Sequence, residues 1–124
     1  MNFPPKNQVV PLEVIKALCL EYGKESLWDL IQKDPPPKPF TSDGVTAFPD
    51  KIHDVDLYPA AFFHDLKYWS GYPGDHNARF VADCELAIDV IQLCGGNHGL
   101  AELMLLGVRG AGVLFWGRGR EGED

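Results

Sequence analysis

The chain has 124 residues, of which 45% are hydrophobic, and its formal net charge is -7 at pH 7. Such a length suits one domain that buries a core of its own. The acidic balance and the scattered lysines and arginines argue against a nucleic-acid partner, and the overall charge opposes an anionic membrane. We therefore predict a single domain over residues 1–124, with an N-terminal tail at 1–10 and a C-terminal tail at 117–124.

Apolar residues predict a broken helix near the N-terminus. They recur at helical spacing over 12–22, Gly23 interrupts the pattern, and it resumes until the proline triplet at 35–37. Over 34–58 the composition changes to Pro, Asp, Lys, Thr and Gly without a sustained period, which indicates a long loop. A loop of that length needs something to hold it, and a metal ion bound by its aspartates would do so.

Two further helices are predicted on either side of a turn. The first begins near Pro59 and ends at about Trp69, where the turn sequence SGYPG follows. The second is capped by Asp75 and runs to about Cys94, before two glycines. Its predicted apolar stripe consists of Phe80, Cys84, Ala87, Ile91 and Cys94.

Asp83 lies on this predicted apolar stripe rather than opposite it. A carboxylate that faces the core needs hydrogen-bond donors, because burying it unpaired is costly. His64 and Tyr68 are one turn apart on the preceding helix and can donate. We therefore expect Asp83 to bind both of them.

The segment from His98 to Trp116 is the most apolar part of the chain, although Glu102 and Arg109 interrupt it. It is too short and too charged to span a bilayer. We predict a buried helix here, followed by a solvated tail from Gly117.

The cysteines and the N-terminus bear on the compartment. Cys19, Cys84 and Cys94 form no CxxC pair and fall among apolar residues of predicted helices, which is typical of buried free thiols. The first residues contain no apolar run of the kind that a signal peptide needs. We expect a cytoplasmic protein, and export without a leader stays open.

The pairing of His64 with Asp83 is typical of a hydrolase. A neutral imidazole can take a proton from water near neutral pH, and a buried carboxylate can hold it in one tautomer. Asp65 adds a hard oxygen ligand next to the histidine. Asp43 and Gly44, in the preceding loop, could add a second carboxylate and a carbonyl oxygen for calcium.

These motifs resemble the phospholipase A2 superfamily, in particular its short bacterial and fungal branch. The resemblance is carried by SDGVTAFPD from Ser42, HDLKYW from His64 and ARFVAD ending at Asp83. It implies an all-α fold in which two antiparallel core helices carry the His/Asp pair, with flanking helices and a calcium-binding loop. It also implies a phospholipid substrate, met at a membrane or micelle surface, whose sn-2 acyl ester is cleaved with calcium as the cofactor.

The resemblance gives a role to each matching residue. His64 activates the attacking water, Asp83 orients the imidazole, and Tyr68 supports Asp83. The calcium ligands that it implies are Asp43, Gly44 and Asp65.

The sequence departs from this family at the cysteines that pair the loop to the helix, where it has Val45 and Ala60-Ala61. We therefore expect a looser loop with a lower calcium affinity, because a site that is not preorganised must be ordered on binding.

Two other functions fit the same residues. One is a helical phosphohydrolase that holds a transition metal through His53, His64, Asp65 and either Asp83 or Asp89. The other is a non-catalytic interaction module that keeps the phospholipase-like core.

Overall fold

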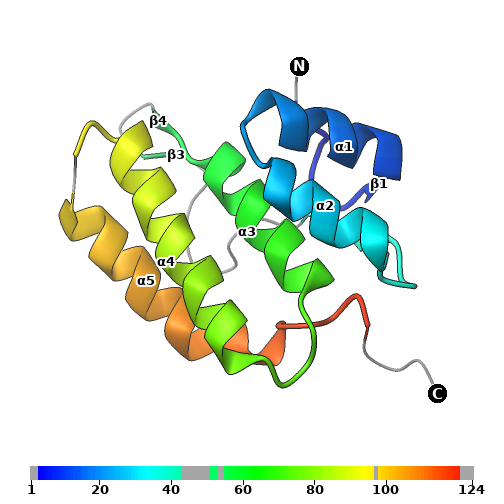
Figure 1. Cartoon of the computed structure of the whole chain (residues 1–124). Coiled ribbons are helices and arrows are strands. Elements are labelled where there is room, and N and C mark those ends of the chain that lie inside the picture. The colour runs from blue at the N-terminus through cyan, green and yellow to red at the C-terminus, as the bar shows by residue number, and fades with distance from the viewer. Residues whose placement is uncertain (1–2, 43–50, 53–54, 97, 121–124) are drawn as a thin grey trace.

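The computed structural model describes residues 3–42, 51–52, 55–96 and 98–120. The chain is mostly helical (Figure 1), so the prediction of an all-α protein is confirmed. The helices are α1 (Leu12–Glu21), α2 (Glu25–Lys33), α3 (Tyr58–Ser70), α4 (His76–Leu93) and α5 (His98–Ala111), and a 3-10 turn η1 (Gly112–Leu114) follows α5. None of the described helices is long and apolar enough to cross a membrane.

Two short ribbons accompany the helices. Strand β1 (Val9–Val10) pairs antiparallel with β2 (Phe40–Thr41), and β3 (Lys51–Ile52) pairs antiparallel with β4 (Val55–Asp56). The described part of the predicted loop at 34–58 therefore contains three two-residue strands. Val10 and Phe40 face each other in the first ribbon and are both buried, so this ribbon ties the chain before α1 to the segment after the prolines.

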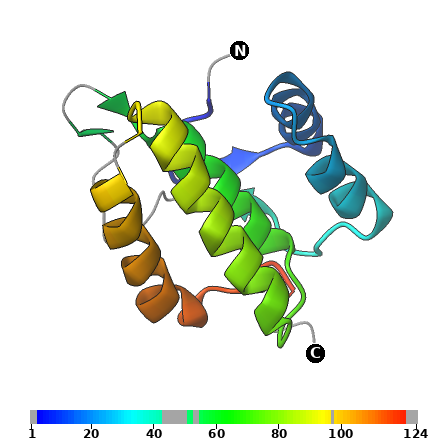
Figure 2. The ribbon, with the colours of Figure 1, turned by 60° about the vertical axis from the view of Figure 1, so that its left-hand side comes forward.

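The three long helices form one layer, and the two N-terminal helices pack on its side (Figures 1 and 2). Helices α3 and α4 run antiparallel and are joined by a tight turn, and α5 packs along α4. In Figure 2, α5 lies on one side of the α3/α4 pair, and α1 and α2 lie on the other. Helix α3 is therefore held between neighbours.

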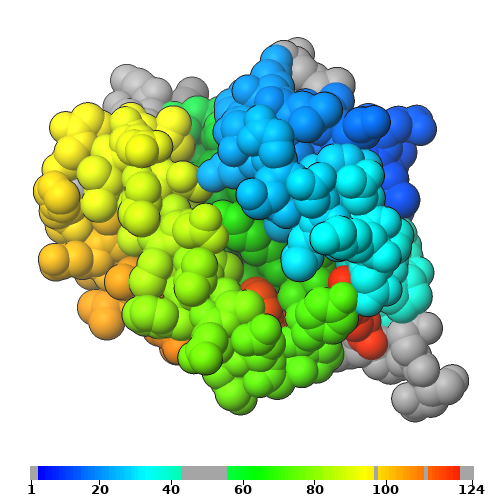
Figure 3. Space-filling view, in the orientation of Figure 1, coloured from blue at the N-terminus to red at the C-terminus, as the bar shows by residue number. Residues whose placement is uncertain are grey.

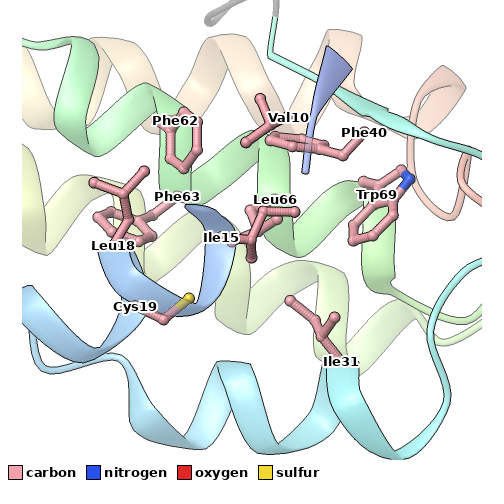
Figure 4. Packing of buried hydrophobic residues seen from close by; sticks show 10 residues of the cluster. All are labelled: Val10, Ile15, Leu18, Cys19, Ile31, Phe40, Phe62, Phe63, Leu66 and Trp69. Carbon is pink, nitrogen blue, oxygen red and sulfur yellow. The ribbon is translucent and has the colours of Figure 1, made fainter. Parts of the chain in front are cut away.

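Two apolar clusters fix α3 in this position. The first lies between α3 and the N-terminal helices (Figure 4), and the second joins the start of α3 to α4 and α5. The first consists of Val10, Ile15, Leu18, Cys19, Ile31, Phe40, Phe62, Phe63, Leu66 and Trp69, and the second of Leu57, Ala60, Leu86, Val90, Ala101, Met104 and Val108. Because α3 contributes to both clusters, side chains along it have little freedom to move.

All three cysteines are free. Cys19 is buried in the first cluster, and burial raises the pKa of its thiol to about 11. Cys84 and Cys94 are only half-buried, so the prediction of three buried thiols is confirmed for Cys19 alone.

The apolar stripe predicted for α4 is buried only in part. Ala87, Ile91 and Cys94 are partly buried and pack against the second cluster. Phe80, the first member of the stripe, is 51% exposed. The face that is buried instead consists of Arg79, Ala82, Asp83, Leu86 and Val90. Two of these residues, Arg79 and Asp83, are charged and of opposite sign. A search for apolar residues at helical spacing therefore does not identify this buried face.

The buried helix predicted after His98 is present, but only one of its faces is buried. Helix α5 buries Ala101, Met104 and Val108, whereas Leu103 and Leu106 are 60% and 71% exposed. The helix packs on α4 through one face, which leaves the opposite face open among the described residues.

Both predicted tails make contacts with the helices in their described parts. At the C-terminal end, the Gly117 amide donates to the Tyr68 carbonyl at 2.8 Å, and Arg120 Nε donates to the Ser70 carbonyl at 3.1 Å. At the N-terminal end, Phe3 packs against Phe62, with their ring centroids 5.0 Å apart. Residues 117–120 are therefore not a solvated tail.

Candidate functional site

Asp83 is the centre of a polar cluster between α3, α4 and α5. Its side chain is completely buried, and its Oδ1 accepts hydrogen bonds from His64 Nε2 at 2.7 Å and from the Tyr68 hydroxyl at 2.6 Å. Its Oδ2 accepts a hydrogen bond from Arg109 Nη1 at 2.9 Å and lies 3.6 Å from Arg79 Nη1. The two hydrogen bonds expected from the sequence are present, and two arginines join them.

Local structure explains why these groups meet. His64 and Tyr68 lie one turn apart on α3, so they present their polar atoms to the same side. Across the turn, the Asp75 side chain accepts a hydrogen bond from the Ala78 amide at 3.0 Å and caps α4. The cap fixes where α4 begins, and Asp83 then falls two turns along the helix, opposite the histidine.

The donors around Asp83 keep it ionised. Burial by itself raises the pKa of a carboxyl group, but the hydrogen bonds from His64, Tyr68 and Arg109 outweigh that effect and hold the pKa of Asp83 below its ordinary value. Burial and the hydrogen bond to Asp83 raise the pKa of Tyr68 far above its usual value. At neutral pH Asp83 is therefore an ionised carboxylate that can only accept hydrogen bonds. The Tyr68 hydroxyl keeps its proton and donates a hydrogen bond to Asp83.

This charge state fixes the tautomer of His64. Because the Asp83 carboxylate can only accept, Nε2 of His64 carries the hydrogen, and in the neutral ring Nδ1 is then the atom that can take a proton. No described residue makes a hydrogen bond to Nδ1. The imidazole is 5% exposed and packs against the Tyr68 ring, with the two centroids 4.4 Å apart. The ring is therefore held in place, with its basic nitrogen turned away from Asp83.

Asp65 is buried at the junction between α3 and the segment before the predicted calcium loop. Its Oδ2 accepts a hydrogen bond from the Ser42 hydroxyl at 3.1 Å, and Ser42 is completely buried. Asp43 and Gly44, the other two predicted calcium ligands, directly follow Ser42 in the chain but lie outside the described residues. The structure thus places Asp65 next to the start of the loop.

Of the ligands of the alternative phosphohydrolase, the described ranges bring His64 and Asp83 together, at 2.7 Å. His53 lies outside them, and Asp89 points to Lys24 Nζ at 3.4 Å rather than to His64. Within the part of the chain that the structure describes, no group of three or more His, Cys, Asp and Glu side chains could hold a metal ion.

Sequence reasoning missed the two arginines. It treated Arg109 only as an interruption of an apolar segment and did not consider Arg79. A signal was available for Arg79, since it precedes Asp83 by four residues, the spacing of an ion pair along one helix face. Arg109 reaches Asp83 only because α5 packs on α4, which the sequence pattern does not specify.

A groove lies between α2, α3 and α4 and is visible as a hollow in Figure 3. This groove has a volume of about 530 Å³ and is lined by Leu27 and Leu30 on one side and by Val81 on the other. The ion pair between Lys67 Nζ and Glu85 Oε1, at 3.4 Å, also borders it. The lining contains none of the residues around Asp83 except Ala82, so the groove is separate from the candidate site.

Comparison of the chain with protein-family models, with curated proteins and with solved structures gives no match.

Proposed function

We propose that this protein is a calcium-dependent hydrolase with a phospholipase A2-like fold, which cleaves the sn-2 acyl ester of glycerophospholipids. The observation that carries the proposal is the hydrogen bond of 2.7 Å between His64 Nε2 and Asp83 Oδ1, supported on the same oxygen by Tyr68. The two partners come from antiparallel helices, which is the arrangement that the sequence resemblance implies.

Water is the nucleophile in this reaction. Nδ1 of His64 takes a proton from the water as its oxygen attacks the ester carbonyl, and the same proton then passes to the leaving alkoxide when the acyl–oxygen bond breaks. The products are a fatty acid and a lysophospholipid. Asp83 stays ionised throughout and stabilises the imidazolium, because its pKa lies below the ordinary value.

Calcium would be held by Asp65, by Asp43 and by the carbonyl oxygen of Gly44. When bound, it supplies positive charge to the substrate phosphate and to the oxyanion that develops on the carbonyl. The chemistry of the donors suits it, since Asp65 is a buried carboxylate beside Ser42 and calcium prefers oxygen ligands.

The test is hydrolysis of a phospholipid labelled in its sn-2 chain, presented in zwitterionic micelles or as a monomeric short-chain lipid because of the acidic net charge. The fatty acid should be released only with calcium, and the sn-1 chain should stay on the lysolipid. His64→Gln should reduce the rate at least about a hundredfold, and Asp83→Asn should reduce it less, because the first removes proton transfer and the second removes orientation. Both variants must keep the helicity of the wild type.

A non-catalytic interaction module is the second candidate. The exposed apolar side chains of α5 and η1 favour it, since Leu103, Leu106 and Leu114 are 60%, 71% and 78% exposed and such surfaces often bind partners. A folded wild type that binds calcium but releases no fatty acid from any phospholipid class would support this candidate and contradict the enzyme.

A further inference from the structure

We propose that Arg109 is a positioning residue for the His64–Asp83 pair: from the last turn of α5 it holds the carboxylate of Asp83 in the orientation that binds the imidazole. This role rests on the proposed function insofar as His64 acts as the base. The hydrogen bonds that it concerns exist without substrate, so they can be measured whether or not the protein is an enzyme.

The two carboxylate oxygens of Asp83 differ in the number of short hydrogen bonds that they accept. Oδ1 accepts two short hydrogen bonds, from His64 at 2.7 Å and from Tyr68 at 2.6 Å. Oδ2 accepts one short bond, from Arg109 at 2.9 Å, because Arg79 Nη1 at 3.6 Å is too far to count as a hydrogen bond. Among the described residues, Arg109 is therefore the group that fixes Oδ2.

Loss of this donor would disturb the whole carboxylate. An oxygen of a fully buried carboxylate cannot turn to water, so without Arg109 it is expected to rotate toward Arg79 to regain a partner. Because both oxygens move together, the same rotation takes Oδ1 away from His64 and Tyr68. The orientation of the imidazole thus depends on a residue that does not touch it.

Each of the two arginines lies on one of the helices α4 and α5 and binds a group on the other. Arg79 Nη1 of α4 donates to the Val108 and Arg109 carbonyl oxygens at 3.4 and 3.5 Å, at the C-terminal end of α5, where a cation is favoured. Arg109 of α5 reaches back to Asp83 of α4. The Arg109 guanidinium also lies over the Phe80 ring, 5.1 Å from its centroid, which restricts its position.

The difference in burial between the arginines shows which one to change. The Arg79 side chain is 7% exposed, and its Nη1 also donates to the Tyr68 hydroxyl at 3.3 Å and to two carbonyl oxygens of α5. Its replacement would therefore disturb more than the contact with Asp83. The Arg109 side chain is 33% exposed, so a shorter or neutral side chain can be accommodated there. Arg109→Met is the informative substitution, because it keeps the apolar stem and removes the donor.

The direct test is NMR of the full chain labelled with nitrogen-15, which observes the Nε2–H proton of His64. In the wild type this proton should be shifted downfield and protected from exchange by its bond to Asp83. In Arg109→Met it should move upfield and exchange at least about tenfold faster, and Arg109→Lys should recover part of the difference, because an ammonium keeps the charge but not the forked geometry. Glu102→Gln, an exposed change on the same helix, is the control and should leave the signal unchanged.

An unchanged His64 signal in a folded Arg109→Met protein would overturn the proposal. If Arg109→Met does not fold, Arg109→Leu, which also lacks a donor, decides in the same way: faster exchange supports the positioning role, and wild-type exchange contradicts it.

A kinetic measurement adds the functional consequence. If the wild type hydrolyses phospholipid, Arg109→Met should lower kcat by about tenfold with little change in KM, because Arg109 acts on the base rather than on substrate binding. A fall in kcat without any change in the His64 signal would contradict positioning. Absence of hydrolysis by the wild type would contradict the proposed function alone, and the NMR result would still decide the role of Arg109.

Discussion

Gly112 packs so closely against Tyr68 that a methyl group at position 112 would overlap the tyrosine hydroxyl. The contact matters because this hydroxyl donates to Asp83 at 2.6 Å. The first turn after α5 thus lies against the candidate site, and only a residue without a side chain fits there.

Gly112→Ala should therefore disturb the hydrogen bond between Tyr68 and Asp83, although Gly112 is not part of that bond. The added methyl group must displace the Tyr68 ring or the backbone at position 112, and overpacking of this kind typically destabilises a protein by about 1 to 3 kcal/mol. Urea denaturation of the variant should show this loss, together with a weaker hydrogen bond between Tyr68 and Asp83. Gly110→Ala is the matched control, because a Cβ at Gly110 meets nothing within 4 Å and alanine favours a helix over glycine. Equal stabilities of the two variants would contradict the steric explanation.

The contact of His64 and Tyr68 with Asp83 could be predicted from the sequence because it follows from two local facts. The histidine and tyrosine are one helical turn apart, and a carboxylate on a core-facing stripe must find donors. The predicted stripe nevertheless differs from the face that is buried, since Phe80 is exposed and Arg79 is buried. In the structure Asp83 is buried on a neighbouring face of α4, together with Ala82 and Leu86.

The role of α5 could not be predicted in the same way. Its sequence is apolar on most sides, so the pattern does not show which face meets α4, and the structure leaves Leu103 and Leu106 exposed. The contact of Arg109 with Asp83 depends on that choice of face and on the angle of packing, which are properties of the tertiary structure. For the same reason the packing of residues 117–120 against Tyr68 and Ser70 has no signal in their glycine-rich and charged composition.

The lowered pKa of Asp83 predicts how stability depends on pH. A carboxyl group whose pKa is lower in the folded state than in the unfolded state adds stability above the unfolded pKa, and this contribution is lost as the pH falls through the folded pKa. The free energy of unfolding should therefore decrease below about pH 4, where an ordinary aspartate begins to take up a proton. Asp83→Asn should be less stable at neutral pH and should show a smaller decrease in acid. An equally steep decrease in both proteins would show that other carboxylates dominate acid unfolding.

Because the three cysteines are free, we expect the stability of the fold not to depend on redox conditions. Since all three thiols are unpaired, a reducing agent should leave the melting temperature nearly unchanged, whereas loss of a native disulfide typically costs about 2 to 5 kcal/mol. Thermal melts with and without reductant test this directly. A marked decrease in the melting temperature on reduction would mean that two cysteines are bonded in solution, which thiol titration of the unfolded protein would confirm.

The contact between Ser42 and Asp65 gives the calcium proposal its sharpest test. Asp65 is a buried carboxylate, so its replacement by alanine would remove both a ligand and the acceptor for the Ser42 hydroxyl. Asp65→Asn keeps the shape and one acceptor oxygen but replaces the other oxygen by a neutral NH2 group, and Ser42→Ala removes only the hydroxyl donor. Titration calorimetry of the wild type should show weak binding, with a Kd on the order of 0.1 to 1 mM, as expected for a site without preorganising cysteines.

Calcium binding should be abolished in Asp65→Asn and weakened in Asp43→Ala, because a divalent cation depends most on the charged oxygen ligands. Ser42→Ala should weaken it less, since the serine orients Asp65 and is not proposed as a ligand. Glu102→Gln, which removes a negative charge from the exposed surface of α5, separates ligation from a general effect of net charge. Wild-type calcium affinity in a folded Asp65→Asn protein would contradict the site. Tight binding of zinc or manganese without any response to calcium would favour the phosphohydrolase instead.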